Sequence, residues 1–321
     1  MASPPMTHAD ILTFAERKVN LHRDAVSKYR AQVAHLHDEL ATYIGRNQNY
    51  DLKDIINFGS VAKGTALSTI SDMDVAVYVR KGEVPTDPKG LLEWMASRLR
   101  EVYPTMAPDQ FRVQSHSVRV SYKGSGLDLD VVPILYTGLT QGRGHLLTKE
   151  TGQFLLTSVP LHLEFIRKRK ERIPNHFAQV IRLLKWWVQE QGKVDANFRL
   201  KSFLVELIVA SLTDRGLIDV SNYPLSLQQV FAYIVKNQLG EVIVFSDFNT
   251  PPPKVSSAEV RIYDPVNSEN NVAENYTRID LERIVERARE ALDALSEAHH
   301  SDTRGRAIEL WQTVLGPSFG L

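Results

Sequence analysis

The fold is decided by two short pieces of sequence, GSVAKGT at residues 59–65 and SDMD at residues 71–74. A β-type run at 54–58 comes before the first piece, and an apolar run at 75–79 follows the second. The nearly continuous apolar character of that second run is typical of a strand covered on both faces. The sequence therefore predicts a strand, a turn of small residues, and a second strand that opens with two carboxylates.

These residue types indicate a phosphate cradle beside a cation site. Side chains alternate along a strand, so Asp72 and Asp74 point to the same face. Two adjacent carboxylates repel each other, and burying them requires a cation; oxygen ligands favour a hard ion such as Mg²⁺. Gly59 lets the backbone approach a polyanion, and Ser60 can donate to phosphate oxygens. The pattern favours phosphoryl or nucleotidyl transfer over the alternative, a turn capped by Ser71-Asp72 with Asp74 as a solvated strand end.

A further carboxylate is available in a third β-type run, LDLDVVP at residues 127–133. Asp128 and Asp130 share one face of that strand and lie roughly 6.6 Å apart along it, so we expect only one of them to join the site directly. Strand alternation does not decide between the two.

Composition excludes several classes of protein. The 321 residues are 43% hydrophobic and 24% charged, which excludes a wholly disordered chain. Lys plus Arg and Asp plus Glu both number 38, so a globally basic nucleic-acid surface is not expected, although a local patch stays open. The absence of cysteine excludes disulfides, thiolate metal sites and a cysteine nucleophile. No secretory signal and no apolar run of about 18 residues are found, so we expect a cytoplasmic protein without a membrane span.

Periodicity predicts an α/β first half and a helical second half. One long helix at 8–45 is expected to form a spine. The run 167–172 (RKRKER) is either a solvated helix end or a site for a partner. We place the domains at 1–165 and 166–321. The other expected helices are 89–102, one from Pro174 through Val188, 203–212, 225–239, 281–295 and 306–315, and the other expected strands are 111–120 and 127–135, joined to each other by a turn at 123–126.

Taken together, G-S, S-D-x-D and L-D-V-V-P resemble the nucleotidyltransferase β superfamily. More narrowly, they are similar to the bacterial cGAS/DncV-like nucleotidyltransferases, the CD-NTases of CBASS anti-phage systems, which are related to oligoadenylate synthase. This resemblance implies an α+β, bilobed fold with a polymerase β-like palm, a C-terminal helical lobe like that of oligoadenylate synthase, and an active cleft between them. It also implies that Asp130 is the third metal ligand beside Asp72 and Asp74, with two Mg²⁺ ions bound and Mn²⁺ as a second candidate.

The resemblance continues through the second half. The stretch at 180–187 (VIRLLKWW) is similar to the family helix whose lysine contacts the triphosphate, which implies that role for Lys185. The stretch at 201–207 (KSFLVEL) likewise implies phosphate contact for Ser202. The stretch at 262–272 (IYDPVNSENNV) resembles a segment near the nucleotide pocket, which implicates Asp264 and Asn271. The match extends to Trp311 and to LGPSF at 315–319, and the departure is Ser268, where the pattern often has proline.

Each of these helical-lobe residues also has an ordinary structural interpretation. Helical geometry puts Lys185 about 40° from Ile181, at the rim of the apolar stripe, where a lysine can reach a cleft or merely extend to solvent. Ser202 can be a helix N-cap before the next residue. Asp264 stands before a proline, as turn openers do. Asn271 can serve only to satisfy backbone groups.

The activity implied by the resemblance is metal-dependent nucleotidyl transfer. A 3′- or 2′-hydroxyl attacks the α-phosphorus of a nucleoside triphosphate, pyrophosphate leaves, and repetition closes a cyclic di- or trinucleotide second messenger. ATP is the expected substrate, with other nucleoside triphosphates open, and a peptide-sensing regulator of the HORMA type is a candidate partner. No obligatory nucleic acid is expected, and an activating one stays open. The alternatives are a linear 2′-5′ oligoadenylate or RNA-tailing enzyme, a toxin-like transferase that modifies protein or tRNA, and a nucleotide sensor without chemistry.

Overall fold

The chain divides into two compact units, which are described separately. The computed structural model describes residues 6–46, 52–70, 72–80, 84–124, 126–147, 153–251, 253 and 256–320. One unit, which we call the palm unit, is Leu21–Ile166; the other, the helical unit, combines Met1–Asn20 with Arg167–Leu321. The first 20 residues, which we had grouped with the catalytic core, thus belong to the helical unit.

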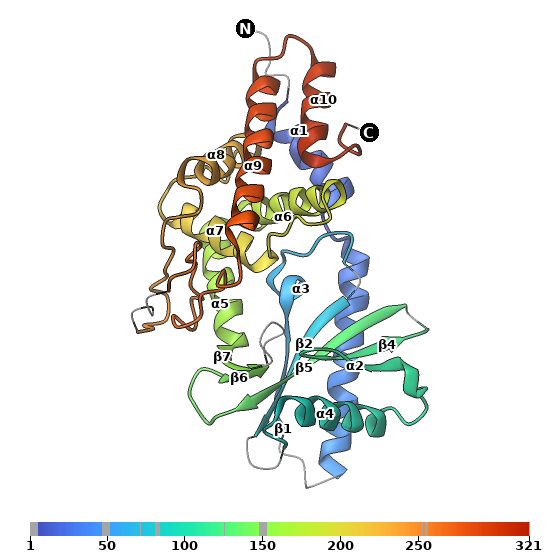
Figure 1. Ribbon diagram of the computed structural model, residues 1–321. Coiled ribbons are helices and arrows are strands. Elements are labelled where there is room, and N and C mark those ends of the chain that lie inside the picture. The colour runs from blue at the N-terminus through green and yellow to red at the C-terminus, as the bar shows by residue number, and fades with distance from the viewer. Residues whose placement is uncertain are drawn as a thin grey trace. The chain divides into compact units, whose positions relative to one another are not determined.

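The described residues of the palm unit form a seven-stranded sheet (Figure 1). The central pair, β2 and β5, is parallel, and the other pairs are antiparallel. The strand order is β1 (Leu52–Phe58), β2 (Asp72–Arg80), β5 (Leu127–Tyr136), β4 (Val118–Tyr122) and β3 (Phe111–Val113), and β6 (Arg143–Leu147) pairs with both β5 and β7 (Phe154–Ser158). The hairpin of β6 and β7 was not predicted.

One face of this sheet carries the main core of the palm unit. Odd-numbered side chains of β2 and β5, such as Val75 and Leu129, are fully buried together with side chains of α2 (Arg23–Arg46) and α4 (Pro88–Val102). Figure 1 shows both helices beside the sheet. Burial of each such side chain stabilises the fold by about 1.5–3 kcal/mol. Because side chains alternate along a strand, the even-numbered residues of β2 and β5 lie on the opposite face. Both faces of β2 are covered from residue 75 to residue 79, as the apolar run predicted.

The predicted single helix at 8–45 is wrong, because it is broken near residue 20. The chain forms α1 (His8–Phe14), one π-helical turn at Ala15–Val19, and α2 after a short extended link. Asn20 leaves the helix with an extended backbone, φ −78° and ψ 136°, and its side chain bonds to Gln179 and Arg182 of α6 (His176–Val194). The break therefore coincides with the boundary between the two units.

The predicted strand at 111–120 also differs from the structure. It consists of β3 and β4, separated by a tight turn in which the Gln114 amide donates to the Ser117 carbonyl over 2.8 Å. β3 and β4 form an antiparallel pair. β4 also pairs with β5, as the predicted turn between them implies, and this neighbour relation matters for the site described below.

The helical unit is built around helices that are buried on several faces. α7 (Ser202–Asp214) is buried continuously from residue 204 to residue 213, and α6 packs beside it. Trp186 of α6 donates from Nε1 to the Leu315 carbonyl at the end of α10 (Arg304–Leu315), over 2.8 Å. The remaining helices are α5 (Val159–Arg172), which also contributes to the palm unit, α8 (Tyr223–Asn237) and α9 (Arg278–His299). No helix among the described residues is long and apolar enough to cross a membrane.

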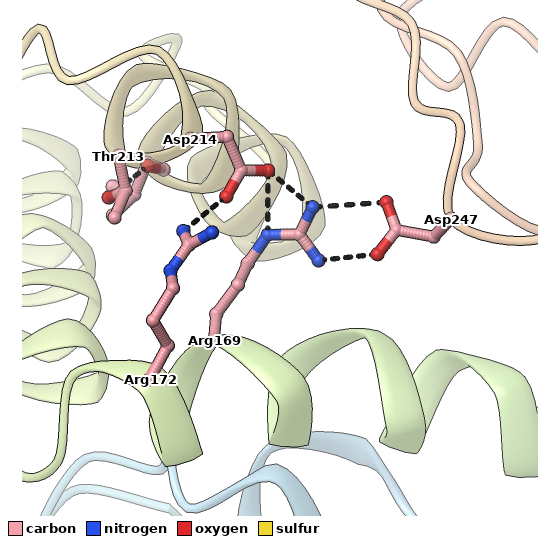
Figure 2. Close-up of polar contacts among 6 residues, drawn as sticks. Arg169, Arg172, Thr213, Asp214 and Asp247 are labelled. Carbon is pink, nitrogen blue, oxygen red and sulfur yellow. Dashed lines mark hydrogen bonds and ion pairs between the residues drawn. The ribbon is translucent and has the colours of Figure 1, made fainter.

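The basic run at 167–172 is neither wholly solvated nor wholly available to a partner. Arg169 is buried, and its guanidinium pairs with Asp214 at the end of α7 and with Asp247, as Figure 2 shows. Arg172 joins the same network through an Nη2–Oδ1 contact of 2.5 Å to Asp214. Asp247 accepts from the buried guanidinium through both of its oxygens and Asp214 through one, so this network fixes α5 to α7 and to the loop after α8.

Candidate functional site

Four aspartates share one face at one end of the palm sheet. β2 and β5 run parallel, and their register pairs Asp72 with Asp128 and Asp74 with Asp130. The two residues between them, Met73 and Leu129, are buried in the core on the opposite face. The structure therefore brings together the three predicted carboxylates, Asp72, Asp74 and Asp130. Ser71 of the quoted motif lies outside the described residues.

A glycine turn holds Asp74 from the β1 side. β1 ends at Phe58, which pairs with Asp74, and the chain turns at Gly59 into the five-residue helix α3 (Gly59–Lys63). Gly59 has φ +70°, a left-handed conformation that favours glycine, and a Cβ on it would lie 2.0 Å from Oδ2 of Asp74. Any side chain at position 59 would therefore displace the carboxylate. Ser60 is the next residue of this turn.

The pKa of the Asp74 carboxyl is shifted by its surroundings. Burial, followed by the negative charges of Asp72 and Asp130, raises the pKa of Asp74 to about 6. The positive charges of Lys63 and Arg119 oppose that rise in part. Bringing so many carboxylates together is costly without a cation, because each charge disfavours ionisation of the others.

A guanidinium lies among these carboxylates. Arg119 of β4 stands opposite Asp130 in the β4–β5 register. It donates from Nε and Nη2 to the two oxygens of Asp130, at 2.8 Å each, and from the same Nη2 to Oδ2 of Asp72 at 2.6 Å. Its Nη1 lies 3.7 Å from Oδ2 of Asp128. Hydrogen bonding to Asp130 raises the pKa of the Arg119 guanidinium above its usual range.

This arrangement fits a divalent cation in its donor chemistry. Oδ2 of Asp72 and Oδ2 of Asp130 come from different strands and meet at one cationic nitrogen of Arg119. Carboxylate oxygens are the ligands that Mg²⁺ and Mn²⁺ prefer. With the guanidinium between them, the side chains do not by themselves form a metal cage anywhere in the described part of the chain. The residues thus converge on one position for positive charge, at present filled by Arg119.

Lys185 and Ser202 lie in the helical unit. Lys185 is 5% exposed rather than at the rim of its helix, so the predicted rim position is wrong. Its Nζ contacts Oε1 of Glu206 on α7 over 2.6 Å, and Glu206 is equally buried. Ser202 is the first residue of α7 and is exposed, while Lys201 occupies the N-cap position, so Ser202 is not an N-cap.

The polar atoms of Asp264 and Asn271 are used within their own loop. Asp264 accepts from the Val266 amide over 2.8 Å, which is the turn geometry expected before a proline. Asn271 accepts from the amides of Ile262 and Ala273 and donates to the Val260 carbonyl and to Glu274. These four bonds measure 2.8–3.1 Å. Both side chains are buried and shape this loop.

Sequence reasoning missed Arg119 and Glu206. The pattern of β4, V-R-V-S-Y, does put Arg119 on the face opposite its buried valines, and that alternation was the available signal. It points to Asp130 only once the register between β4 and β5 is known, because that register places Arg119 opposite Asp130. Glu206 lies four residues after Ser202 in an apolar helix, and a charged residue in such a helix signals a buried partner.

Comparison with known proteins finds a matching family model and proteins of similar sequence. Residues 6–169 match the model of the Second Messenger Oligonucleotide or Dinucleotide Synthetase domain. The chain is 46% identical over 99% of both chains to the Cyclic AMP-AMP-AMP synthase of Escherichia coli (strain MS 115-1). It is 30% identical over 98% of both chains to the CBASS oligonucleotide cyclase CdnC of Escherichia coli (strain KTE188).

Solved structures are similar over the full length. The structure of Escherichia coli MS115-1 CdnC with ATP superposes with a TM-score of 0.94 at 46% identity, covering 99% of this chain and 100% of that one. The complex of the same CdnC with HORMA-deltaN gives a TM-score of 0.93 at 46% identity, covering 98% of this chain and 99% of that one.

Proposed function

The chain belongs to the Second Messenger Oligonucleotide or Dinucleotide Synthetase family of cGAS/DncV-like nucleotidyltransferases, and we propose that it makes a cyclic oligoadenylate second messenger from ATP in CBASS defence. The observation that carries this proposal is 46% identity, over 99% of both chains, to a Cyclic AMP-AMP-AMP synthase. The aspartate group at the end of β2 and β5 supports the same chemistry independently, because it offers oxygen ligands beside a glycine turn.

In this proposal Asp72, Asp74 and Asp130 hold the two divalent ions, for which Mg²⁺ is the first candidate and Mn²⁺ the second. Enzymes of this kind are metal-dependent, and the bound ions lower the pKa of the attacking hydroxyl and neutralise charge on the phosphates. The sheet supplies the orientation, since a parallel register fixes three carboxylates from two strands on one face. Asp74 must lose its proton before it can bind a cation, and its raised pKa of about 6 places that step just below neutral pH.

The phosphates of the donor nucleotide are proposed to lie against backbone and side-chain donors. Gly59 leaves room at the turn, and the Ser60 hydroxyl and nearby amides can donate to phosphate oxygens. Lys185 and Ser202 are proposed to meet the triphosphate from the helical unit, with Lys185 held in place by Glu206. Asp264 and Asn271 contribute through the shape of the loop that they organise.

Mass spectrometry of the products tests the function. The purified chain is incubated with ATP alone and with all four nucleoside triphosphates, in Mg²⁺ or Mn²⁺, with and without the HORMA protein of the Escherichia coli MS115-1 complex. We expect a cyclic triadenylate that resists phosphatase. A product that keeps a phosphatase-sensitive 5′ end indicates a linear oligoadenylate synthase. Label that appears only on added RNA, tRNA or protein supports a tailing or toxin-like transferase instead.

A HORMA-type regulator is the proposed partner, because the similar CdnC has been solved in complex with HORMA-deltaN. An activating nucleic acid is not required by the proposal. A cytoplasmic location, where the nucleotide substrates and a phage signal would both be present, is part of the same proposal.

Gly59→Ala is expected to reduce turnover by about tenfold to a hundredfold. The new Cβ would lie 2.0 Å from Oδ2 of Asp74, so the carboxylate must move, and φ +70° adds strain of about 1–2 kcal/mol. Gly126→Ala is the matched control, because Gly126 has φ +67° and a Cβ there meets nothing within 4 Å. Initial rates and urea unfolding are measured for both variants. Equal losses of rate in both would mean that the strain, and not the displaced carboxylate, accounts for the effect.

A further inference from the structure

Arg119 is placed by the sheet and not by a flexible loop. Its neighbours Val118 and Val120 are fully buried in the palm core, which fixes the strand on which it stands. Its backbone pairs with Asp130 in the β4–β5 register. The side chain is 27% exposed, so solvent ions can reach the guanidinium and the carboxylates that it contacts.

The contacts of Arg119 are those of a counter-ion for the aspartate group. Asp130 binds it through both oxygens, and Asp72 shares the same Nη2 nitrogen. A guanidinium and a divalent ion cannot both occupy this position, because like charges at a few ångströms repel strongly in a partly buried site. Two of the three carboxylates that would hold metal, Asp72 and Asp130, are thus the ones that Arg119 contacts.

Asp128 offers the guanidinium a second position. It stands on the same face of β5 as Asp130, two residues earlier, and its Oδ2 is 3.7 Å from Nη1 of Arg119. That distance is a loose ion pair, whereas the contacts to Asp72 and Asp130 are 2.6–2.8 Å. If the Arg119 side chain rotated along the strand, it would lose its short contacts to Asp72 and Asp130 and gain a short contact to Asp128.

We propose that Arg119 is a built-in cation that holds Asp72 and Asp130 together in the metal-free enzyme and competes with the divalent ions for them, and that Asp128 receives the guanidinium when metal binds. This inference rests on the proposed function, in that Asp72 and Asp130 are taken as metal ligands. It gives a role to Arg119 and Asp128, neither of which is among the proposed metal ligands. Arg119 then sets the metal concentration at which the site fills.

The test is equilibrium binding of Mn²⁺ without nucleotide, measured from the electron paramagnetic resonance signal of the free ion. Arg119→Gln is expected to bind Mn²⁺ about tenfold to a hundredfold more tightly than the parent chain, because the competing charge is gone. Arg112→Gln is the matched control. Arg112 stands on the adjacent strand β3 and pairs with Arg119, so this substitution removes the same charge at a greater distance from the carboxylates. We expect it to change affinity by less than about threefold.

Asp128 is tested in the same titration. Asp128→Asn is expected to weaken Mn²⁺ binding several-fold, since the guanidinium loses its second position, and to have a clearly smaller effect in the Arg119→Gln background. Equal effects of Asp128→Asn in both backgrounds would refute the receiving role of Asp128. If Arg119→Gln does not fold, Arg119→Lys serves instead. It keeps the charge but cannot bind Asp130 in a bidentate manner, and it is expected to bind Mn²⁺ more tightly than the parent chain.

The outcomes separate this inference from the proposed function. Weaker or unchanged Mn²⁺ binding in the Arg119 variants would overturn the competition and make Arg119 an organiser of the carboxylates. Asp130→Asn, included in the series, is expected to lose the site. Mn²⁺ binding by Asp130→Asn that equals the parent chain would instead overturn the metal assignment itself.

Discussion

Asp130→Asn is expected to abolish nucleotidyl transfer, with a loss of about a thousandfold or more. Asparagine keeps the shape of the side chain but removes the negative charge that a divalent ion requires. The corresponding loss of about 4 kcal/mol in transition-state stabilisation is within the range for a metal ligand. Asp72→Asn and Asp74→Asn are expected to behave alike, since all three stand on one face of β2 and β5.

The rate of product formation from ATP checks this expectation, with thermal unfolding measured in parallel. Asp109→Asn is the control, because Asp109 is an exposed carboxylate in the same unit that contacts Lys123. It is expected to keep the parent rate. Full activity in Asp130→Asn would remove the residue from the proposed metal site. Asp128→Asn, in the same assay, would then show whether the other carboxylate of β5 takes that place.

Lys185→Met is expected to cause the largest loss of stability, about 3–5 kcal/mol, because it leaves Glu206 buried without its ion-pair partner. This loss would itself lower activity and hide any role of Lys185 in binding phosphate. The double variant Lys185→Met/Glu206→Leu removes both charges from the buried pair. We expect it to recover most of the stability, since apolar side chains of similar size often replace such pairs without cost.

Activity of the double variant then reports on Lys185 alone. We expect kcat/KM for ATP to stay about tenfold to a hundredfold below the parent value, the loss of one charged hydrogen bond to phosphate. Urea unfolding gives the stability, and initial rates over a range of ATP concentrations give the kinetic constants. Recovery of both stability and activity would assign Lys185 a structural role only.

The sequence was a good guide wherever alternation along a strand carried the information. Asp72 and Asp74 were expected on one face of β2, and the register with β5 adds Asp130. Alternation could not choose between Asp128 and Asp130, and the structure brings both onto the same guanidinium, at different distances. Arg119 was missed because the predicted turn at 123–126 did not specify the register of the two strands, and it is the register that places Arg119 opposite Asp130.

Helical periodicity was less informative about single residues. The apolar stripe of α6 predicted a rim position for Lys185, but the residue is buried because Glu206 of another helix pairs with it. Likewise, the 8–45 pattern continues through the helix break at Asn20, where side-chain bonds to α6 hold the backbone extended. Both differences arise from partners about 20 or more residues away in sequence, which a local period does not detect.

The discontinuous helical unit has a consequence for synthesis on the ribosome. The first 20 residues emerge before the whole palm, yet their partners in α6 and α10 emerge only after it. Three apolar residues of this segment are almost fully buried in the finished protein: Ile11, Phe14 and Val19. They therefore stay exposed to solvent while residues 21–166 are translated. At about 5–20 residues per second, the nascent chain exposes this apolar stretch for many seconds, long enough for a chaperone to bind it.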